Sequence, residues 1–215
     1  MLMDLLPKNQ KKRKRMIYSI GHSTLEIPKF LELIKEIDVV LDVRSHPTSH
    51  WPQYRQEEMQ QWLPKNGKKY EWEPGLGGWD KRHSPLLEEM KQYDVDLTSY
   101  LKGKFPKQTI AKKIQNYPLF EGSKPTWTSR GLYDYSFFMK TNEFKDALGK
   151  LMERKENIGI LCCELLWWKC HRSMISDVIV YQKSDVVHLQ PKRVKHSDVI
   201  GNRLSRYDQR IIENW

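Results

Sequence analysis

The sequence has no run of 18 or more apolar residues, which argues against a membrane-spanning helix. Its 215 residues include only three cysteines, a small and odd number that argues against a disulfide scaffold. The first residues also lack the apolar stretch of a secretory signal, because Leu5-Leu6 is followed by Pro7 and a basic run. Together these absences favour a reducing compartment, and we expect a cytoplasmic protein without a membrane partner.

The composition indicates a folded chain with excess positive charge. Hydrophobic residues make up 39% of it, and eight Trp with ten Tyr are too many for a disordered chain. The formal net charge is +10, and half of it lies in residues 1–15, where six Lys and Arg oppose one Asp. Such a leader is either a solvated tail or a segment that attracts a polyanion, and the partner it then predicts is nucleic acid or a nucleotide. The oligomeric state does not follow from the composition.

Strand-like and helix-like segments alternate along the chain. The apolar run 16–20 is followed by apolar residues at helical spacing over 27–37 and then by the apolar run 39–43. The second half predicts helices over 141–152 and 170–181, and strands over 158–163 and 186–189. This alternation predicts an α/β protein with a Rossmann-like three-layer fold and a mostly parallel sheet.

The remaining segments set the expected domain limits. Residues 45–80 are rich in Pro, Gly, His and Trp, and we interpret them as loop with a short strand at 69–73. A basic aromatic insertion is expected over about 81–131. The domain then covers residues 16–191, with a disordered basic leader at 1–15 and a basic C-terminal extension at 192–215.

Three of the expected strands end in polar residues. These ends are Gly21-His22-Ser23, Asp42-Val43-Arg44-Ser45 and Cys163-Glu164. Open parallel sheets bind ligands at the carboxyl ends of their strands. We therefore expect these residues to share one crevice with the segment Cys170-His171-Arg172.

The same motifs are similar to those of the domain of unknown function 488 family. The similarity is carried by Gly21-His22-Ser23, Asp42 to Ser45 with Pro47, Leu76-Gly77-Gly78, Phe138-Met139, Glu143-Phe144, and Cys162-x-Glu164 leading to Cys170-His171-Arg172. It covers roughly residues 16–190 and implies a Rossmann-like fold but no particular activity. The chain departs from the family between Glu164 and Cys170, where Leu-Leu-Trp-Trp-Lys replaces a polar link with proline. That link is either an aromatic wall beside the site or a plug of the core.

The Cys170-His171-Arg172 segment carries the strongest chemical signal. A thiol at a helix N-terminus beside two cations favours a thiolate, which predicts that Cys170 is a nucleophile; a small buried residue is an equal alternative. His171 is predicted to be a general base or an orienting donor, and its alternative is a surface imidazole.

Two carboxylates complete the predicted catalytic set. An acid at the end of a buried strand is costly unless it is paired or used, so Asp42 and Glu164 are predicted to act with Cys170 and His171. Arg44 and Arg172 form either a fork for phosphate or internal ion pairs with these acids. The remaining predicted phosphate-binding residues are Gly21, His22, Ser23 and Ser45, with Ser23 as a helix cap in the alternative interpretation.

No cofactor is expected. The spacing of Cys162, Cys163, Cys170 and His171 does not match the short Cys pairs of zinc ribbons and fingers, so no metal is predicted. The glycine-rich fingerprint of dinucleotide sites is absent after the first strand.

Three functions remain open at this point. The first is an enzyme acting on a nucleic acid, a nucleotide, or another phosphorylated or glycosylated substrate through the Glu/Asp and Cys-His-Arg residues. The second is a nucleic-acid-binding module without catalysis. The third is a thiol-based sulfur-transfer enzyme, because Asp42-Val43-Arg44 resembles the second-strand signature of rhodanese; the segment that follows Cys170 is a weak substitute for the rhodanese loop.

Overall fold

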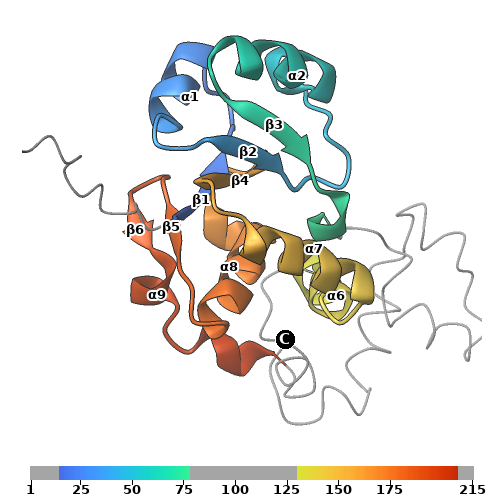
Figure 1. Ribbon diagram of the computed structural model, residues 1–215. Helices are drawn as coiled ribbons and strands as arrows, with labels where there is room; N and C mark the ends of the chain where they lie inside the picture. The colour runs from blue at the N-terminus through green and yellow to red at the C-terminus, as the bar shows by residue number, and fades with distance from the viewer. Residues whose placement is uncertain (1–14, 78–129, 208–215) are drawn as a thin grey trace, which may run out of the picture.

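A six-stranded sheet organises residues 15–77 and 130–207, the part of the chain that this computed structural model describes (Figure 1). Its strands are β1 (Ile17–Gly21), β2 (Val39–Asp42), β3 (Lys69–Trp72), β4 (Ile158–Cys162), β5 (Val186–His188) and β6 (Val194–Lys195). They lie in the order β3-β2-β4-β1-β5-β6, and only β5 and β6 pair antiparallel. The carboxyl ends of β1, β2 and β4 therefore meet at one edge of the sheet.

Helices cover both faces of the sheet. The helices are α1 (Ile27–Leu33), α2 (Gln56–Lys65), α6 (Arg130–Phe138), α7 (Asn142–Glu153), α8 (Arg172–Tyr181) and α9 (His196–Val199). Figure 1 shows α1 and α2 on one side of the sheet and α6, α7 and α8 on the other. This arrangement confirms the predicted α/β, Rossmann-like fold with a mostly parallel sheet.

Alternation along each buried strand builds two separate cores. In β1, Ile17 packs with the residues of α6, α7 and α8, whereas Tyr18 and Ile20 pack with those of α1 and α2. Strand β4 alternates in the same way, with Ile160 on the α8 face and Leu161 on the α1 face. The face to which a strand-end side chain points is therefore fixed by its position in the strand.

The structure agrees with most of the predicted elements and corrects one. The predicted strands appear as β1 to β5, and Thr141 caps α7 by accepting the amide of Phe144 at 3.3 Å. The interpretation of residues 45–80 as loop misses α2, which buries Met59 and Leu63. These two positions are four residues apart on one face, but the polar residues around them and the internal Pro64 hide the helical pattern.

The C-terminal residues pack onto the sheet as far as Tyr207. Strand β6 pairs with β5, and His196, Arg203 and Tyr207 all bond to the buried carboxylate of Asp177. The predicted leader, except for Arg15, and nearly all of the predicted insertion lie outside the described residues. Among the residues described, no helix has the length and apolar character needed to cross a membrane.

Candidate functional site

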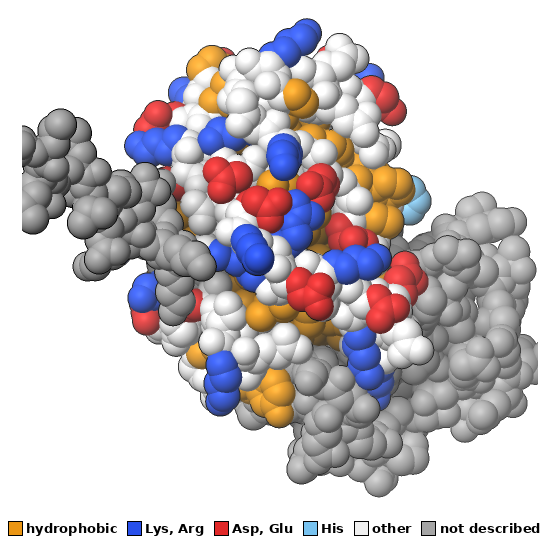
Figure 2. Space-filling view, viewed as in Figure 1, with side chains coloured by type: hydrophobic (Ala, Val, Ile, Leu, Met, Phe, Trp, Pro, Cys, Tyr) orange, Lys and Arg blue, Asp and Glu red, His pale blue; other side chains and the backbone are white. Residues whose placement is uncertain are grey.

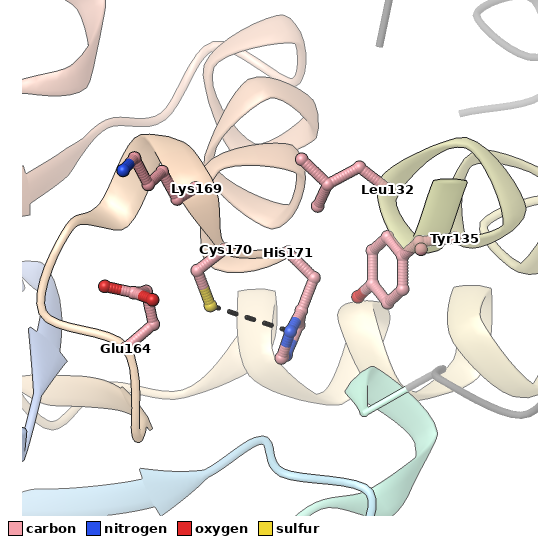
Figure 3. Close-up of a pocket in the computed structure, with 7 residues that line it drawn as sticks. Leu132, Tyr135, Glu164, Lys169, Cys170 and His171 are labelled. Atoms are coloured by element: carbon pink, nitrogen blue, oxygen red, sulfur yellow. Dashed lines mark hydrogen bonds between the residues drawn. The ribbon is translucent and has the colours of Figure 1, made fainter. Parts of the chain in front are cut away.

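Cys170 and His171 form a thiol–imidazole pair just before α8. The Cys170 Sγ atom lies 3.6 Å from Nδ1 of His171 (Figure 3). The other ring nitrogen, Nε2, donates to the carbonyl oxygen of Val43 at 3.0 Å, which directs Nδ1 toward the sulfur. This geometry lets the imidazole take the thiol proton and stay beside the resulting thiolate.

Arg172 supplies a second cation to the same sulfur. Its Nε atom donates to Cys170 Sγ at 3.5 Å, and its Nη atoms donate to Ser19 Oγ at 3.1 Å and to the carbonyl oxygen of Glu164. The side chain is fully buried and contacts no carboxylate among the described residues. A thiolate on Cys170 is therefore the natural counter-charge of this guanidinium.

Cys162, at the end of β4, is the third group on this sulfur. Burial disfavours the Cys170 thiolate, but the hydrogen bond from Cys162 and the charges of His171 and Arg172 outweigh it and hold the pKa of Cys170 well below its ordinary range. Burial also opposes the imidazolium, yet the neighbouring thiolate raises the pKa of His171. Donation to Cys163 and Cys170, together with burial, raises the pKa of the Cys162 thiol well above its usual value.

A pocket opens onto the thiol–imidazole pair. It has a volume of about 210 Å³, and its lining is Gly131, Leu132, Tyr135, Glu164, Lys169, Cys170 and His171. In Figure 3, Cys170 and His171 lie between Glu164 on the loop after β4 and Tyr135 on α6. The Leu166 amide holds one Glu164 carboxylate oxygen at 3.0 Å. The predicted residues Glu164, Cys170 and His171 therefore do share one site.

Asp42 and Arg44 lie on the other face of the sheet, against the core of α1 and α2. The Arg44 Nε atom donates to Oδ1 of Asp42 at 2.8 Å, and its Nη1 atom donates to the carbonyl oxygens of Thr48 at 3.1 Å and Tyr54 at 3.0 Å. The Tyr70 hydroxyl donates to Oδ2 of Asp42 at 2.8 Å. Both charged side chains are buried, so this is an internal ion pair.

The structure thus does not bring Asp42 and Arg44 into the pocket, in contrast to the expected single crevice. Arg44 makes an internal ion pair, which was one of the two roles expected for it. Arg172 does not, because it contacts the backbone carbonyl of Glu164 rather than its carboxylate. Neither arginine lines the pocket. The catalytic role predicted for Asp42 and the phosphate-binding roles of the two arginines stay predictions.

The Gly21-His22-Ser23 segment begins at the last residue of β1 and lies next to the loop after β4. The amides of His22 and Ser23 each donate at 3.0 Å, to the carbonyl oxygens of Cys162 and Cys163. These amides are therefore engaged within the protein. Ser23 does not cap α1, whose N-cap is Glu26 without a side-chain hydrogen bond, so that alternative is wrong. The phosphate-binding role predicted for this segment and for Ser45 stays a prediction.

The Trp-Trp link contains one core plug and one exposed ring. Trp167 stacks on His188 with ring centroids 3.9 Å apart and planes 4° apart, whereas Trp168 is 40% exposed. His188 in turn bonds to His196, and His196 bonds to Asp177. Sequence patterning does not reveal this buried chain of side chains, although His188 also ends a strand.

Two thiol sulfurs and one imidazole nitrogen, each a possible metal ligand, gather beside the pocket. Cys162 Sγ, Cys170 Sγ and a ring nitrogen of His171 all lie within 4.8 Å of one another. Sequence spacing cannot reveal this grouping, because Cys162 and Cys170 meet only through the turn between β4 and α8. The absence of a metal stays a prediction.

The charge on the described surface is mixed where Figure 2 shows it. On that face, Lys and Arg side chains are interspersed with Asp and Glu side chains. An extended basic patch for a polyanion is therefore not seen on this face.

Comparison with known proteins bears on the family. No curated protein and no solved structure matched the chain. One family model did match: Domain of unknown function DUF488, over residues 27–116. The matched segment includes α1, β2 and the 3-10 turn Pro74–Leu76, and it ends before the Cys-His-Arg segment. The resemblance predicted from the motifs is thus confirmed over residues 27–116, the part of the chain that the DUF488 model matches.

Proposed function

We propose that this protein is an enzyme in which the Cys170 thiolate is the nucleophile and His171 is the base that activates it. The observation that carries the proposal is the set of contacts on one sulfur: His171 Nδ1 at 3.6 Å and Arg172 Nε at 3.5 Å. A cysteine that served only as a small core residue would not need two nitrogen donors, and it would not open onto a pocket.

Glu164 is assigned the role of acid and base on the substrate. The Cys170 thiolate attacks an electrophilic carbon or phosphorus atom and forms a bond to it. The leaving group departs with the bonding electron pair and takes a proton from Glu164. Water then gives a proton back to Glu164, attacks the covalent intermediate and releases the thiolate.

The substrate class we propose is a nucleotide, a nucleic acid end, or another phosphorylated or glycosylated molecule. A cavity of about 210 Å³ is smaller than the roughly 300–1,000 Å³ of typical ligand pockets, so it receives one ring or one charged group of a larger substrate. Lys169 in the lining and the net charge of +10 favour an anionic ligand.

The test is turnover by the full chain on pools of nucleotides, oligonucleotides, sugar phosphates and glycosides, followed by mass spectrometry. We expect one class to be converted by the wild-type protein, with a loss of at least about 100-fold in Cys170→Ser and Glu164→Gln. With a substrate whose leaving group needs no proton, a covalent adduct should accumulate on Cys170 in Glu164→Gln, because the base for its hydrolysis is missing. Undiminished turnover in Cys170→Ser would overturn the proposal.

Sulfur transfer is the second candidate function. The supporting observation is that β2, which ends in the Asp42-Val43-Arg44 step, pairs directly with β4, the strand that leads to Cys170. The Cys170 thiolate would then attack the outer sulfur of thiosulfate, break its S–S bond and release sulfite, and the resulting persulfide would be seen as one added sulfur on the tryptic peptide 170–172. An unmodified peptide after this treatment would count against sulfur transfer.

A further inference from the structure

Cys162 is a buried thiol that the proposed reaction does not use. Its Sγ atom lies within 4.8 Å of Cys170 Sγ, and the side chain is 6% exposed. Cys162 does not line the pocket, whereas Cys170 does. A small oxidant that enters the pocket therefore meets Cys170 first, with Cys162 directly behind it.

We propose that Cys162 is the resolving thiol of Cys170, so that hydrogen peroxide converts the two into a reversible disulfide. The proposal rests on the nucleophilic Cys170 of the proposed function and adds to it a defined oxidised state. Cys162 would protect the nucleophile from irreversible oxidation and switch off the enzyme while the peroxide persists.

The chemistry balances in two steps. The Cys170 thiolate attacks one peroxide oxygen and the O–O bond breaks, which yields a sulfenic acid on Cys170 and hydroxide. His171, as the imidazolium, protonates the hydroxide to water. The Cys162 thiol then displaces the hydroxyl group of the sulfenic acid, its proton leaves with that group as a second water, and the S–S bond forms. The two thiols are oxidised and the peroxide is reduced.

The neighbouring cysteine provides a matched control. Cys163 is exposed, and its Sγ atom lies 4.0 Å from that of Cys162. The hydrogen bond from Cys162 lowers the pKa of Cys163 to about 6, which favours a thiolate on Cys163 as well. It lies outside the pocket lining, so we expect it to be dispensable for the Cys162–Cys170 disulfide.

The sequence allows the products to be mapped without ambiguity. Trypsin cleavage after Lys155, Lys169 and Arg172 leaves Cys162 and Cys163 on peptide 156–169 and Cys170 on peptide 170–172. A disulfide to Cys170 therefore appears as a linked pair of peptides. The linked pair does not tell whether Cys162 or Cys163 is bonded to Cys170. The two single-cysteine variants answer that question.

The experiment treats the full chain with hydrogen peroxide and then with dimedone, which traps sulfenic acid. We expect the linked pair in wild type and, within about twofold, in Cys163→Ala, and its release by dithiothreitol. In Cys162→Ser, whose hydroxyl keeps a hydrogen-bond donor beside the Cys170 thiolate, the linked pair should fall at least about tenfold, and the dimedone adduct on Cys170 should rise.

Three results would overturn the proposal, and they have different meanings. A persistent sulfenic acid on Cys170 of the wild-type protein would remove the resolving role alone. A linked pair lost only in Cys163→Ala would assign that role to Cys163. Bound zinc that protects both sulfurs from peroxide would make them metal ligands instead. The proposed function fails by a different result, namely a Cys170 that does not react with peroxide or dimedone in any variant.

Discussion

A Cβ atom added to Gly21 would lie 2.1 Å from the carbonyl oxygen of Glu164, closer than two such atoms can approach. The same carbonyl oxygen accepts a hydrogen bond from the Arg172 guanidinium. The end of β1 thus passes against the loop that carries Glu164, and only glycine leaves room for that loop. This contact explains the glycine of the Gly-His-Ser motif by shape.

We therefore expect Gly21→Ala to lower the free energy of unfolding by about 1–3 kcal/mol and to slow alkylation of Cys170. The control is Gly149→Ala on α7, where a Cβ atom meets nothing within 4 Å. The free energy of unfolding of that variant should rise by up to about 1 kcal/mol, because alanine favours the helix. Urea unfolding of both variants tests whether the two changes in stability have opposite signs. A Gly21→Ala variant as stable as the wild type would show that Gly21 is not needed for this contact.

Removing one partner of the Asp42–Arg44 pair should destabilise the fold without disturbing the thiol. Asp42→Asn or Arg44→Met leaves the other charge buried, which costs about 3–5 kcal/mol. Because the pair faces α1 and α2, the rate of Cys170 alkylation in the folded variants should change by less than about twofold. A large loss of thiol reactivity in stably folded Asp42→Asn would instead favour the predicted catalytic role of Asp42.

The stability of the protein should fall as the pH drops from 7 to 4.5. Burial lowers the pKa of His22 to about 4 and that of His188 to about 2, so both stay neutral in the folded state. The unfolded chain binds protons below about pH 6.5, and stability therefore rises with pH up to that value and then levels off. Each histidine contributes roughly 2 kcal/mol over this interval.

Urea unfolding at several pH values measures this slope. The His22→Phe variant, which keeps a ring against Tyr54, should lose about half of it. An unchanged slope in that variant would show that His22 does not take part.

The two adjacent tryptophans should respond differently to the same substitution. Trp167→Ala removes the ring that covers His188 and should cost about 3–5 kcal/mol. Trp168→Ala alters an exposed ring and should cost less than about 0.5 kcal/mol. Thermal unfolding of the pair checks the assignment of Trp167 to the core, and equal losses would be inconsistent with it.

The sequence predicted the parts of the fold that depend on apolar patterning. The buried strands around Val40 and Ile160 read as continuous apolar runs, and α7 showed its stripe and its cap at Thr141. Helix α2 could not be recognised, because Met59 and Leu63 are its only buried residues and polar residues surround them.

The candidate site was predicted only in part, for a different reason. Strand ends pointed correctly to Glu164 and to the segment that begins at Cys170. They did not specify the face of the sheet, and one step along β2 separates the α1 side from the α8 side. The partnership of Cys162 with Cys170 depends on the shape of the Trp-containing turn, which local sequence does not encode.

The most direct test of the central claim is the pH dependence of iodoacetamide alkylation at Cys170, followed on the tryptic peptide 170–172 so that Cys163 does not contribute. We predict half-maximal reactivity at a pH well below 8.5, the pKa of an ordinary cysteine, and a shift toward that pH in His171→Ala. An ordinary or raised pKa for Cys170 in the wild-type protein would contradict it.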